Sequence, residues 1–281
     1  MSPDFYSHAA QLASAGQTFV IATVVRVEGS SSARLGSKAI IDGQGKLLAG
    51  WVGGGCAESA VKSEALKCIE TERPQLITLD LRDEELGVGM PCGGTMDVFI
   101  EPVLPKPTLL IVGHGRIAET LAKLGHLMGF YISVNDAAAD PRAFPDASQL
   151  VTDDFDLTET PVGPKTFVVI ATQHKRDHLW LQKALEGNAA YVALIASRHR
   201  AKLVLDYLAV AGLPQHKIAS VHAPAGLDLG AAMPEEIALS IVSEMVAVRR
   251  GGRVAPLSLR ESDLEANGAA DVVIRHCEAQ G

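Results

Sequence analysis

Several features are missing from this sequence of 281 residues, and each absence excludes a class of protein. There is no run of about eighteen apolar residues, and the N-terminus MSPDFYSHAAQ lacks a basic region followed by an apolar stretch, so we expect neither a membrane span nor a signal peptide. Lysines and arginines form no cluster, and the formal net charge is -8. Nucleic acid is therefore not expected as a partner.

Cysteine is also scarce, because the chain has only four: Cys56, Cys68, Cys92 and Cys277. They form no CxxC pair and no framework spacing, which argues against a structural zinc site and against disulfides. Free thiols in a reducing compartment are the simpler interpretation, and we expect a cytoplasmic protein. A hydrophobic fraction of 47% over this length predicts two domains, each with its own core.

The segment 89–102, GMPCGGTMDVFIEP, presents one of these thiols in an open position. Cys92 lies between a proline and the pair Gly93 and Gly94, just before an alternating strand over 95–100. The glycines leave the thiol without bulky neighbours and let a ligand approach the backbone closely. The alternative is a tight turn that holds a small hydrophobic residue; we favour a functional thiol at the mouth of a strand.

A second thiol follows a run of three glycines. Gly53, Gly54 and Gly55 precede Cys56, and an apolar helical pattern begins there. A helix N-terminus favours a thiolate, and the glycines can form a backbone nest for a phosphate. Cys68 differs, because it lies on the apolar face of the same helix, where core packing is the expected role.

The first domain contains one further candidate loop. A helix over about 3–15 should precede a strand over 18–27 that is apolar enough to be buried on both faces. The strand leads into a loop of small and hydroxylated residues that includes Ser30 and Arg34. Hydroxyls, backbone N–H groups and one guanidinium suit an anionic ligand, whereas the alternative is a solvated connection. A hairpin with a Gly43–Gly45 turn should follow.

Three prolines in the segment 102–107 predict a linker, and a nucleotide-binding pattern follows it. A short apolar strand leads to Gly113 and Gly115, an amphipathic helix follows, and the next strand ends at Asp136. This context is typical of a Rossmann unit, in which the glycines approach a diphosphate and the acid holds ribose hydroxyls. Arg116 can pair with a phosphate. The alternative is a glycine turn retained for packing alone.

The remaining sequence alternates strands and helices, which predicts a parallel sheet covered by helices on both faces. His174 and His178 are four residues apart, but capping or exposure is a better interpretation than a metal site. Ser197 occupies a helix N-cap position where an anion contact is plausible. Asp228 either braces its loop or lies in a site. A last helix should begin at Pro234.

Three of these segments together resemble a known family. SSSARLGSKAIIDGQGKLLAGWVGGGC, PCGGTMDVFIEP and HAPAGLDLGAAMPEEIALSI are similar to the XdhC/CoxI family of accessory proteins for xanthine dehydrogenase and CO dehydrogenase type molybdoenzymes. The resemblance covers about residues 16–250. It implies an α/β fold with an N-terminal mixed α/β domain over 1–101, the linker 102–107, a Rossmann-like doubly wound parallel-sheet domain over 108–250 and a tail over 251–281.

The resemblance also implies a function. The family binds molybdenum cofactor, promotes its sulfuration with a cysteine desulfurase and passes it to a client molybdoenzyme. Its two motif cysteines correspond to Cys92 and Cys56, and Cys92 is a possible molybdenum contact because thiolates are soft ligands. The cofactor would be molybdopterin or its cytidine dinucleotide, with a nucleotide possible in the Rossmann domain. We expect a chaperone rather than a turnover enzyme, and a long apolar final helix makes a homodimer reasonable.

Two alternatives remain from the residues alone. The glycine turn could serve an NAD(P)-dependent oxidoreductase, for which His114 and His174 are weakly placed acid–base candidates. It could also serve a binding module in which nucleotide gates cofactor release without being consumed.

Overall fold

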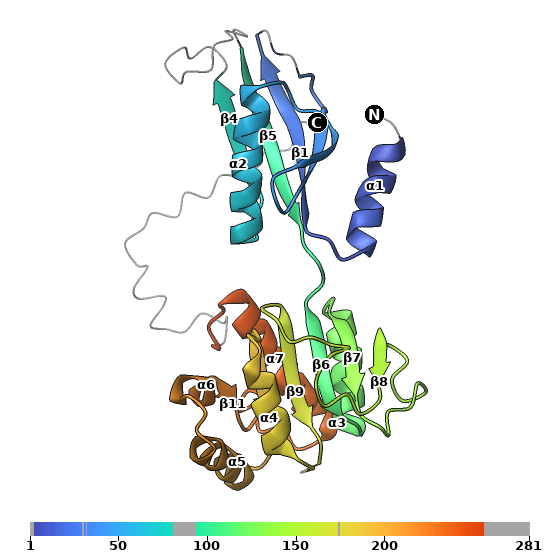
Figure 1. Cartoon of the computed structure of the whole chain (residues 1–281), viewed down its shortest axis with the longest axis vertical. Helices are drawn as coiled ribbons and strands as arrows, with labels where there is room; N and C mark the ends of the chain where they lie inside the picture. Colours follow the sequence, from blue (N-terminus) through green and yellow to red (C-terminus); the bar gives the residue numbers. More distant parts are fainter. Residues whose placement is uncertain (1–2, 30, 32, 81–93, 174, 256–281) are drawn as a thin grey trace, which may run out of the picture. The chain divides into compact units, whose positions relative to one another are not determined.

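The computed structural model describes residues 3–29, 31, 33–80, 94–173 and 175–255. It divides into two compact units, and the chain passes from the first to the second after Pro107 (Figure 1). The first unit contains an antiparallel sheet and the second a parallel one. The predicted α/β class, with a mixed first domain and a Rossmann-like second domain, is confirmed.

The first unit is a five-stranded sheet with two helices. Its strand order is β3-β2-β1-β5-β4, and each neighbouring pair is antiparallel. The predicted first helix, hairpin and glycine-led helix are all present. The elements are α1 (Pro3–Ser14), β1 (Phe19–Glu28), β2 (Lys38–Asp42), β3 (Leu47–Gly50), α2 (Cys56–Thr71), β4 (Gln75–Asp80) and β5 (Thr95–Val103).

Helices pack on both faces of this sheet, but not along its whole length. Alternate residues of β1 face opposite ways, so that Val20 joins the cluster under α2 while Phe19 joins the cluster under α1. The prediction that β1 is buried on both faces holds only as far as Val24. After Val24 the side chains of the strand are no longer covered on both faces, and Val25 is 44% exposed.

The predicted linker is shorter than 102–107, because β5 continues through Val103. Pro102 lies opposite Val20 of β1. The neighbour on the other side, β4, pairs only with Thr95–Ile100, so one side of β5 is unpaired at Pro102. A strand tolerates proline where it has an edge of this kind. The residues between the two sheets are therefore only 104–107.

The second unit is a six-stranded sheet in the order β11-β10-β9-β6-β7-β8. Counted within this unit the order is 6-5-4-1-2-3, the doubly wound arrangement whose switch point lies between β6 and β9. The strands are β6 (Thr108–Gly113), β7 (Tyr131–Asn135), β8 (Gln149–Val151), β9 (Thr166–Ala171), β10 (Tyr191–Leu194) and β11 (Val221–His222).

Helices cover this sheet as predicted. Side chains of α4 and α5 form one cluster with β6, β9 and β10, while α3 packs against α7. The helices are α3 (Arg116–Leu127), α4 (Asp177–Glu186), α5 (Arg198–Val210), α6 (Gln215–Ala219) and α7 (Pro234–Arg250). Sequence reasoning missed α6 and β11, which are too short to show a period. None of the helices in the described residues is long and apolar enough to cross a membrane.

Candidate functional site

Strand register brings two of the predicted loops to one end of the first sheet. Thr95, the first residue of β5, lies opposite Glu28 at the end of β1 and opposite Asp80 at the end of β4. The serine-rich loop leaves from Glu28, and the chain segment that contains Cys92 joins Asp80 to Thr95. Both loops therefore start from the same row of residues across three adjacent strands.

The serine-rich loop is attached to the start of β5. The Ser31 hydroxyl lies 3.7 Å from the Met96 sulfur and accepts a hydrogen bond from the Ala33 N–H. The Ala33 side chain is buried in the same cluster as Met96. Arg34 is exposed in the following turn, which leaves its guanidinium available to an anion. Ser30 lies outside the described residues.

The start of α2 lies at this same end. Ala57 belongs to the cluster of Ala33 and Met96, whereas the Cys68 thiol, three turns along the helix, lies 3.9 Å from the Ile100 carbonyl in the middle of β5. The helix and β5 thus run in the same direction, with Cys56 toward Thr95. Cys56 is the first residue of α2, is half-buried, and follows Gly55 at the N-cap without a side-chain cap.

The three glycines before Cys56 differ in what requires them. Gly53 and Gly55 have φ of +118° and +54°, a region that favours glycine. Gly54 has no such φ, and a Cβ built on it meets nothing within 4 Å among the described residues. Gly94 is buried at the base of β5. Cys92 and Gly93 lie outside the described residues.

Cys68 is a core residue, as predicted. Its side chain is fully buried against the sheet, and burial raises the pKa of its thiol, with a further contribution from nearby Glu64. A thiol in this state is a poor nucleophile. Cys56 and Cys68 thus share one helix but have different environments.

The second candidate site begins at the predicted glycine turn between β6 and α3. Gly113 has a φ of +126°, and a Cβ there would lie 2.3 Å from the Ala171 carbonyl oxygen of β9. Gly115 is the N-cap of α3 with a φ of +100°, and no side chain caps the helix. The turn therefore passes close to β9, and no side chain of the described residues caps the first N–H groups of α3.

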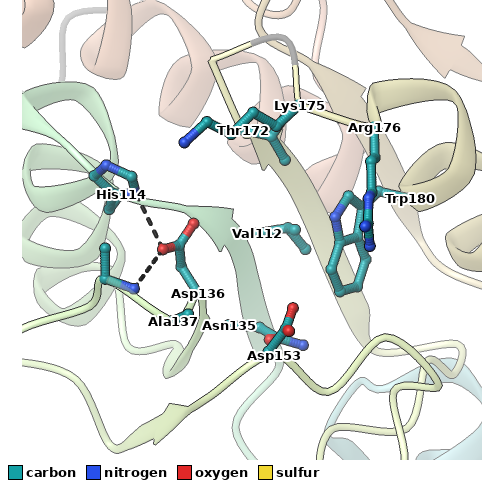
Figure 2. Close-up of a pocket in the computed structure, with 11 residues that line it drawn as sticks. Val112, His114, Asn135, Asp136, Ala137, Asp153, Thr172, Lys175, Arg176 and Trp180 are labelled. Atoms are coloured by element: carbon teal, nitrogen blue, oxygen red, sulfur yellow. Dashed lines mark hydrogen bonds and ion pairs between the residues drawn. The ribbon is translucent and has the colours of Figure 1, made fainter.

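A pocket of about 660 Å³ opens beside this turn, at the carboxyl ends of β6 to β9 (Figure 2). Ligands bind at this edge, next to the switch point, in open α/β sheets. The described lining residues include two carboxylates, two cations and one tryptophan. They are Val112, His114, Asn135, Asp136, Ala137, Ala138, Asp153, Thr172, Lys175, Arg176 and Trp180.

Asp136 is held in place at the end of β7. Its Oδ1 accepts a hydrogen bond of 2.7 Å from the Ala138 N–H and lies 3.0 Å from Nδ1 of His114 (Figure 2). That histidine nitrogen is buried, and its approach has the distance of an ion pair without the angle of a hydrogen bond. The predicted ribose-binding acid and the turn histidine therefore lie side by side in the pocket.

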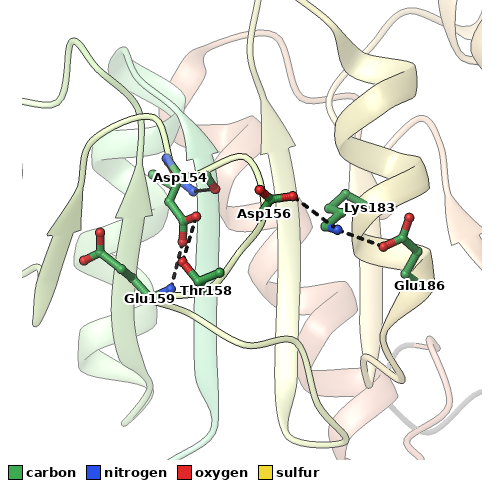
Figure 3. A network of polar contacts seen from close by, with 7 residues as sticks. Asp154, Asp156, Thr158, Glu159, Lys183 and Glu186 are labelled. Carbon is green, nitrogen blue, oxygen red and sulfur yellow. Dashed lines mark hydrogen bonds and ion pairs between the residues drawn. The ribbon is translucent and has the colours of Figure 1, made fainter.

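The wall beside β7 is braced by the loop after β8. The Asn135 side chain donates to the Asp154 carbonyl at 2.8 Å and accepts from its N–H at 3.2 Å. The Asp154 carboxylate in turn accepts from Thr158 and from the Glu159 N–H (Figure 3). Asp153, which lines the pocket with a φ of +56°, is fixed by these neighbours.

The opposite wall is the loop from β9 to α4. The Thr172 hydroxyl donates to Asp177, a carboxylate that is almost wholly buried, and Arg200 of α5 pairs with it at 3.2 Å. This buried pair fixes a loop in which Arg176 has a φ of +60°. The loop carries Lys175 and Arg176 into the pocket. The sequence did not single out these two residues, and His174, which it did consider, lies outside the described residues.

His178 is not part of a metal site in the described residues. It lies in the first turn of α4, which begins at Asp177, so position 174 precedes the helix and the spacing of four has no helical meaning here. Its ring packs on Tyr207 of α5 with centroids 4.4 Å apart. Among the described residues no group of three potential ligands could hold a metal ion.

Three predicted site residues lie away from the pocket lining. Arg116 pairs with Glu235 at the start of α7, with its guanidinium 2.6 Å from the carboxylate. Ser197 caps α5 by accepting a hydrogen bond from the Arg200 N–H, as its N-cap position predicted. Asp228 is 88% exposed and lies 3.6 Å from Arg198. In this structure Arg116 contacts the start of α7, Ser197 caps α5, and Asp228 contacts Arg198 at the surface.

Sequence reasoning missed a partly buried polar network around Glu244 of α7. Its carboxylate accepts from the Tyr191 hydroxyl at 2.5 Å and from the Gly226 N–H at 3.0 Å, and lies 3.0 Å from Nδ1 of His222. Burial alone would raise the pKa of Glu244, but these three partners together lower it. Burial and the bond to Glu244 raise the pKa of Tyr191. The network holds the loop before α7 against β10 and β11.

Comparisons with known proteins match both units. Residues 12–80 match the family described as "XdhC and CoxI family", and residues 109–245 match the one described as "XdhC Rossmann domain".

Three curated relatives are similar to the chain. The uncharacterized protein YqeB of Escherichia coli is 32% identical over 279 residues, which is 97% of this chain and 50% of YqeB. A probable xanthine dehydrogenase subunit of Bacillus subtilis is 33% identical over 162 residues, 56% of this chain and 47% of that protein. The molybdenum cofactor insertion chaperone PaoD of E. coli is 22% identical over 83% of this chain and 84% of PaoD.

The chain spans about half the length of the first two relatives. The family matches lie on the two units that the structure separates, one in the antiparallel unit and the other in the doubly wound unit. The chain therefore belongs to the XdhC and CoxI family, and residues 109–245 form its Rossmann domain.

Proposed function

We propose that this protein holds molybdenum cofactor as cargo and serves in the maturation of a xanthine dehydrogenase or CO dehydrogenase type molybdoenzyme. Family membership supports a maturation role, and one relative is named a molybdenum cofactor insertion chaperone. The observation that carries the proposal is the strand register, which gathers the serine-rich loop, the chain on either side of Cys92 and the start of α2 at one end of the first sheet.

The residues at this end suit an anionic, sulfur-rich cargo. The uncapped start of α2 offers backbone N–H groups to a phosphate, and Gly54 leaves space beside them. Arg34 and the hydroxyls of its loop add donors. The Cys56 thiol, at the positive end of the helix dipole, is a soft ligand or a sulfur carrier, and Cys92 is the second candidate for the same two roles.

The finer form of the proposal concerns partners. A cysteine desulfurase would supply sulfur for exchange of an oxo by a sulfido ligand, and the client molybdoenzyme would then receive the cofactor. In this proposal the cofactor is bound as molybdopterin or as its cytidine dinucleotide. A homodimer and a cytoplasmic location remain predictions; light scattering of the purified chain measures the first.

Cofactor retention tests the proposal. The chain is purified from cells that make the cofactor, and pterin and molybdenum are measured per chain. We expect Cys92→Ser and Cys56→Ser each to lower retention several-fold, because each removes a soft ligand. If both variants keep as much cofactor as the unaltered chain, the proposed site is wrong.

A matched control is available on the same helix. Cys68→Ala removes a thiol that is buried against the sheet, so retention should stay unchanged while stability falls slightly. Equal loss of cofactor in the Cys68 and Cys56 variants would show that retention follows stability rather than a thiol contact.

A further inference from the structure

We propose that the pocket of the Rossmann domain binds a nucleoside diphosphate with an intact ribose 2′,3′-diol, and that it has no place for the second nucleoside of a dinucleotide. This inference goes beyond the cofactor role proposed above and is independent of it, because every described lining residue belongs to the second unit. It rests on the charges around the pocket, on the glycine turn and on where the lining stops.

The ribose is assigned to Asp136. One carboxylate oxygen is already engaged by the Ala138 N–H and His114, which fixes the orientation of the group. Among the described residues the hydrogen bond and the ion pair of Asp136 both use the first oxygen, so the second can accept hydrogen bonds from a diol. A fixed carboxylate after the second strand of a doubly wound sheet is the usual ribose ligand, and its charge repels a 2′-phosphate.

The phosphates are assigned to the glycine turn and the wall opposite Asp136. The start of α3 has no side-chain cap, and His114, the residue directly before its N-cap Gly115, lines the pocket. Lys175 and Arg176 approach from the loop after β9 and add two positive charges (Figure 2). The pocket is thus acidic where the second and third strands end and basic where the fourth ends.

The extent of the pocket distinguishes a diphosphate from a dinucleotide. A volume of about 660 Å³ could hold either ligand, so the position of the lining residues along the sheet edge must distinguish the two. In doubly wound folds the second nucleoside lies over the strands beyond the switch point, here β9, β10 and β11. The described lining reaches the end of β9 but contains no residue from the ends of β10 and β11. Ser197 there caps α5, and His222 and Gly226 are engaged by Glu244.

Calorimetric titration of the full chain tests this assignment. The ligands are ADP and CDP, which separate the two bases, together with 2′-deoxy-ADP, 2′-deoxy-CDP and NAD. The variant is Asp136→Asn. Its matched control is Asp140→Asn, the same change four residues later, where the carboxylate also accepts from the N–H two residues on but lies outside the lining.

We expect ADP or CDP to bind, and its 2′-deoxy form to bind about tenfold more weakly, because a hydrogen bond to a charged group is lost. Asp136→Asn should weaken the ribonucleotide by a similar factor and remove the difference between ribo and deoxy forms. Asp140→Asn should change neither. NAD should bind no more tightly than ADP, because its nicotinamide half finds no contacts.

Three results would overturn the inference. They are no binding of either diphosphate at millimolar concentration, equal binding of ribo and deoxy forms by the unaltered chain, and NAD binding more than tenfold tighter than ADP. The ribo–deoxy comparison needs no variant, so it stands even if Asp136→Asn folds poorly. Pterin retention measured on the same samples keeps the two proposals separate, since either can fail alone.

Discussion

The two units each contain a strand, a glycine turn and a helix without a side-chain cap, but the glycines are needed for different structural reasons. Gly113 in the Rossmann turn is required by packing, because a Cβ would strike the backbone of Ala171. Gly54 in the turn before α2 is required by nothing in the described structure, neither by φ nor by a neighbour. Gly55, beside it, is required by its backbone conformation alone.

This difference separates glycines that the fold requires from a glycine that has open space beside it. A motif search treats the two turns alike, because each reads as glycines before a helix. Their alanine variants should not behave alike, and the order of the effects tests the distinction. The two tryptophans make the test practical, because Trp51 lies in the first unit and Trp180 in the second.

The largest effect is expected for Gly113→Ala. The new Cβ would lie 2.3 Å from a carbonyl oxygen, at a φ of +126° that alanine rarely adopts. The atoms that would have to move are backbone atoms of the turn and of Ala171 in β9, and backbone shifts in a packed sheet cost energy. We therefore expect a loss of about 3 kcal/mol or more in the free energy of unfolding of the second unit. Urea unfolding in a Trp51→Phe background, followed by Trp180 fluorescence, measures it.

The same experiment includes its own control. A Trp180→Phe background reports the first unit, whose midpoint should stay constant when Gly113 is changed. A Gly113→Ala variant as stable as the parent would mean that the turn relaxes without loss, and the contrast with the first unit would disappear.

The next effect concerns the partly buried Glu244 network that contacts the loop before α7. Glu244→Gln places an amide nitrogen among donors, and we expect a loss of about 2 kcal/mol at pH 7. The folded-state pKa of Glu244 is lowered, so its stabilisation is fully present above the unfolded value of about 4.3 and is lost as pH falls through the folded value.

Urea unfolding at pH 7 and at successively lower pH checks this prediction. The difference in free energy of unfolding between the parent and Glu244→Gln should disappear as pH drops below the unfolded-state pKa of Glu244. Protonation of Glu244 removes the negative charge that the variant already lacks. Tyr191→Phe is the matched variant, because it removes one donor and leaves the charge. If the difference in free energy of unfolding stays unchanged at low pH, the loss comes from packing and not from the charge of Glu244.

The sequence predicted those features that depend on neighbours along the chain. The β6–turn–α3 unit followed from glycines and apolar period, and Cys68 was placed in the core from helical spacing. Pro102 was assigned to the linker because local propensity cannot show that β4 stops short of it. The Arg116–Glu235 and Tyr191–Glu244 contacts join residues 119 and 53 positions apart, so only the folded chain reveals them.

A smaller effect is expected for Gly55→Ala. Its φ of +54° and ψ of -109° suit glycine, yet a Cβ would meet nothing within 4 Å of the described residues. Backbone strain acts without a clash, and we expect a loss of about 1–2 kcal/mol in the first unit. Trp51 fluorescence in a Trp180→Phe background measures it. A loss as large as that of Gly113→Ala would show that strain, rather than contact with β9, dominates at both turns.

The smallest effect on stability, and the most informative, is expected for Gly54→Ala. With no demand from φ or packing, alanine should leave the unfolding midpoint of the first unit within about 0.5 kcal/mol of the parent. If a phosphate of the cargo approaches the start of α2, the added methyl should still reduce pterin retention several-fold. Retention and stability measured on one preparation decide the matter: unchanged values of both would mean that the open space beside Cys56 serves no ligand, whereas loss of cofactor from an intact fold would identify Gly54 as a ligand-facing residue.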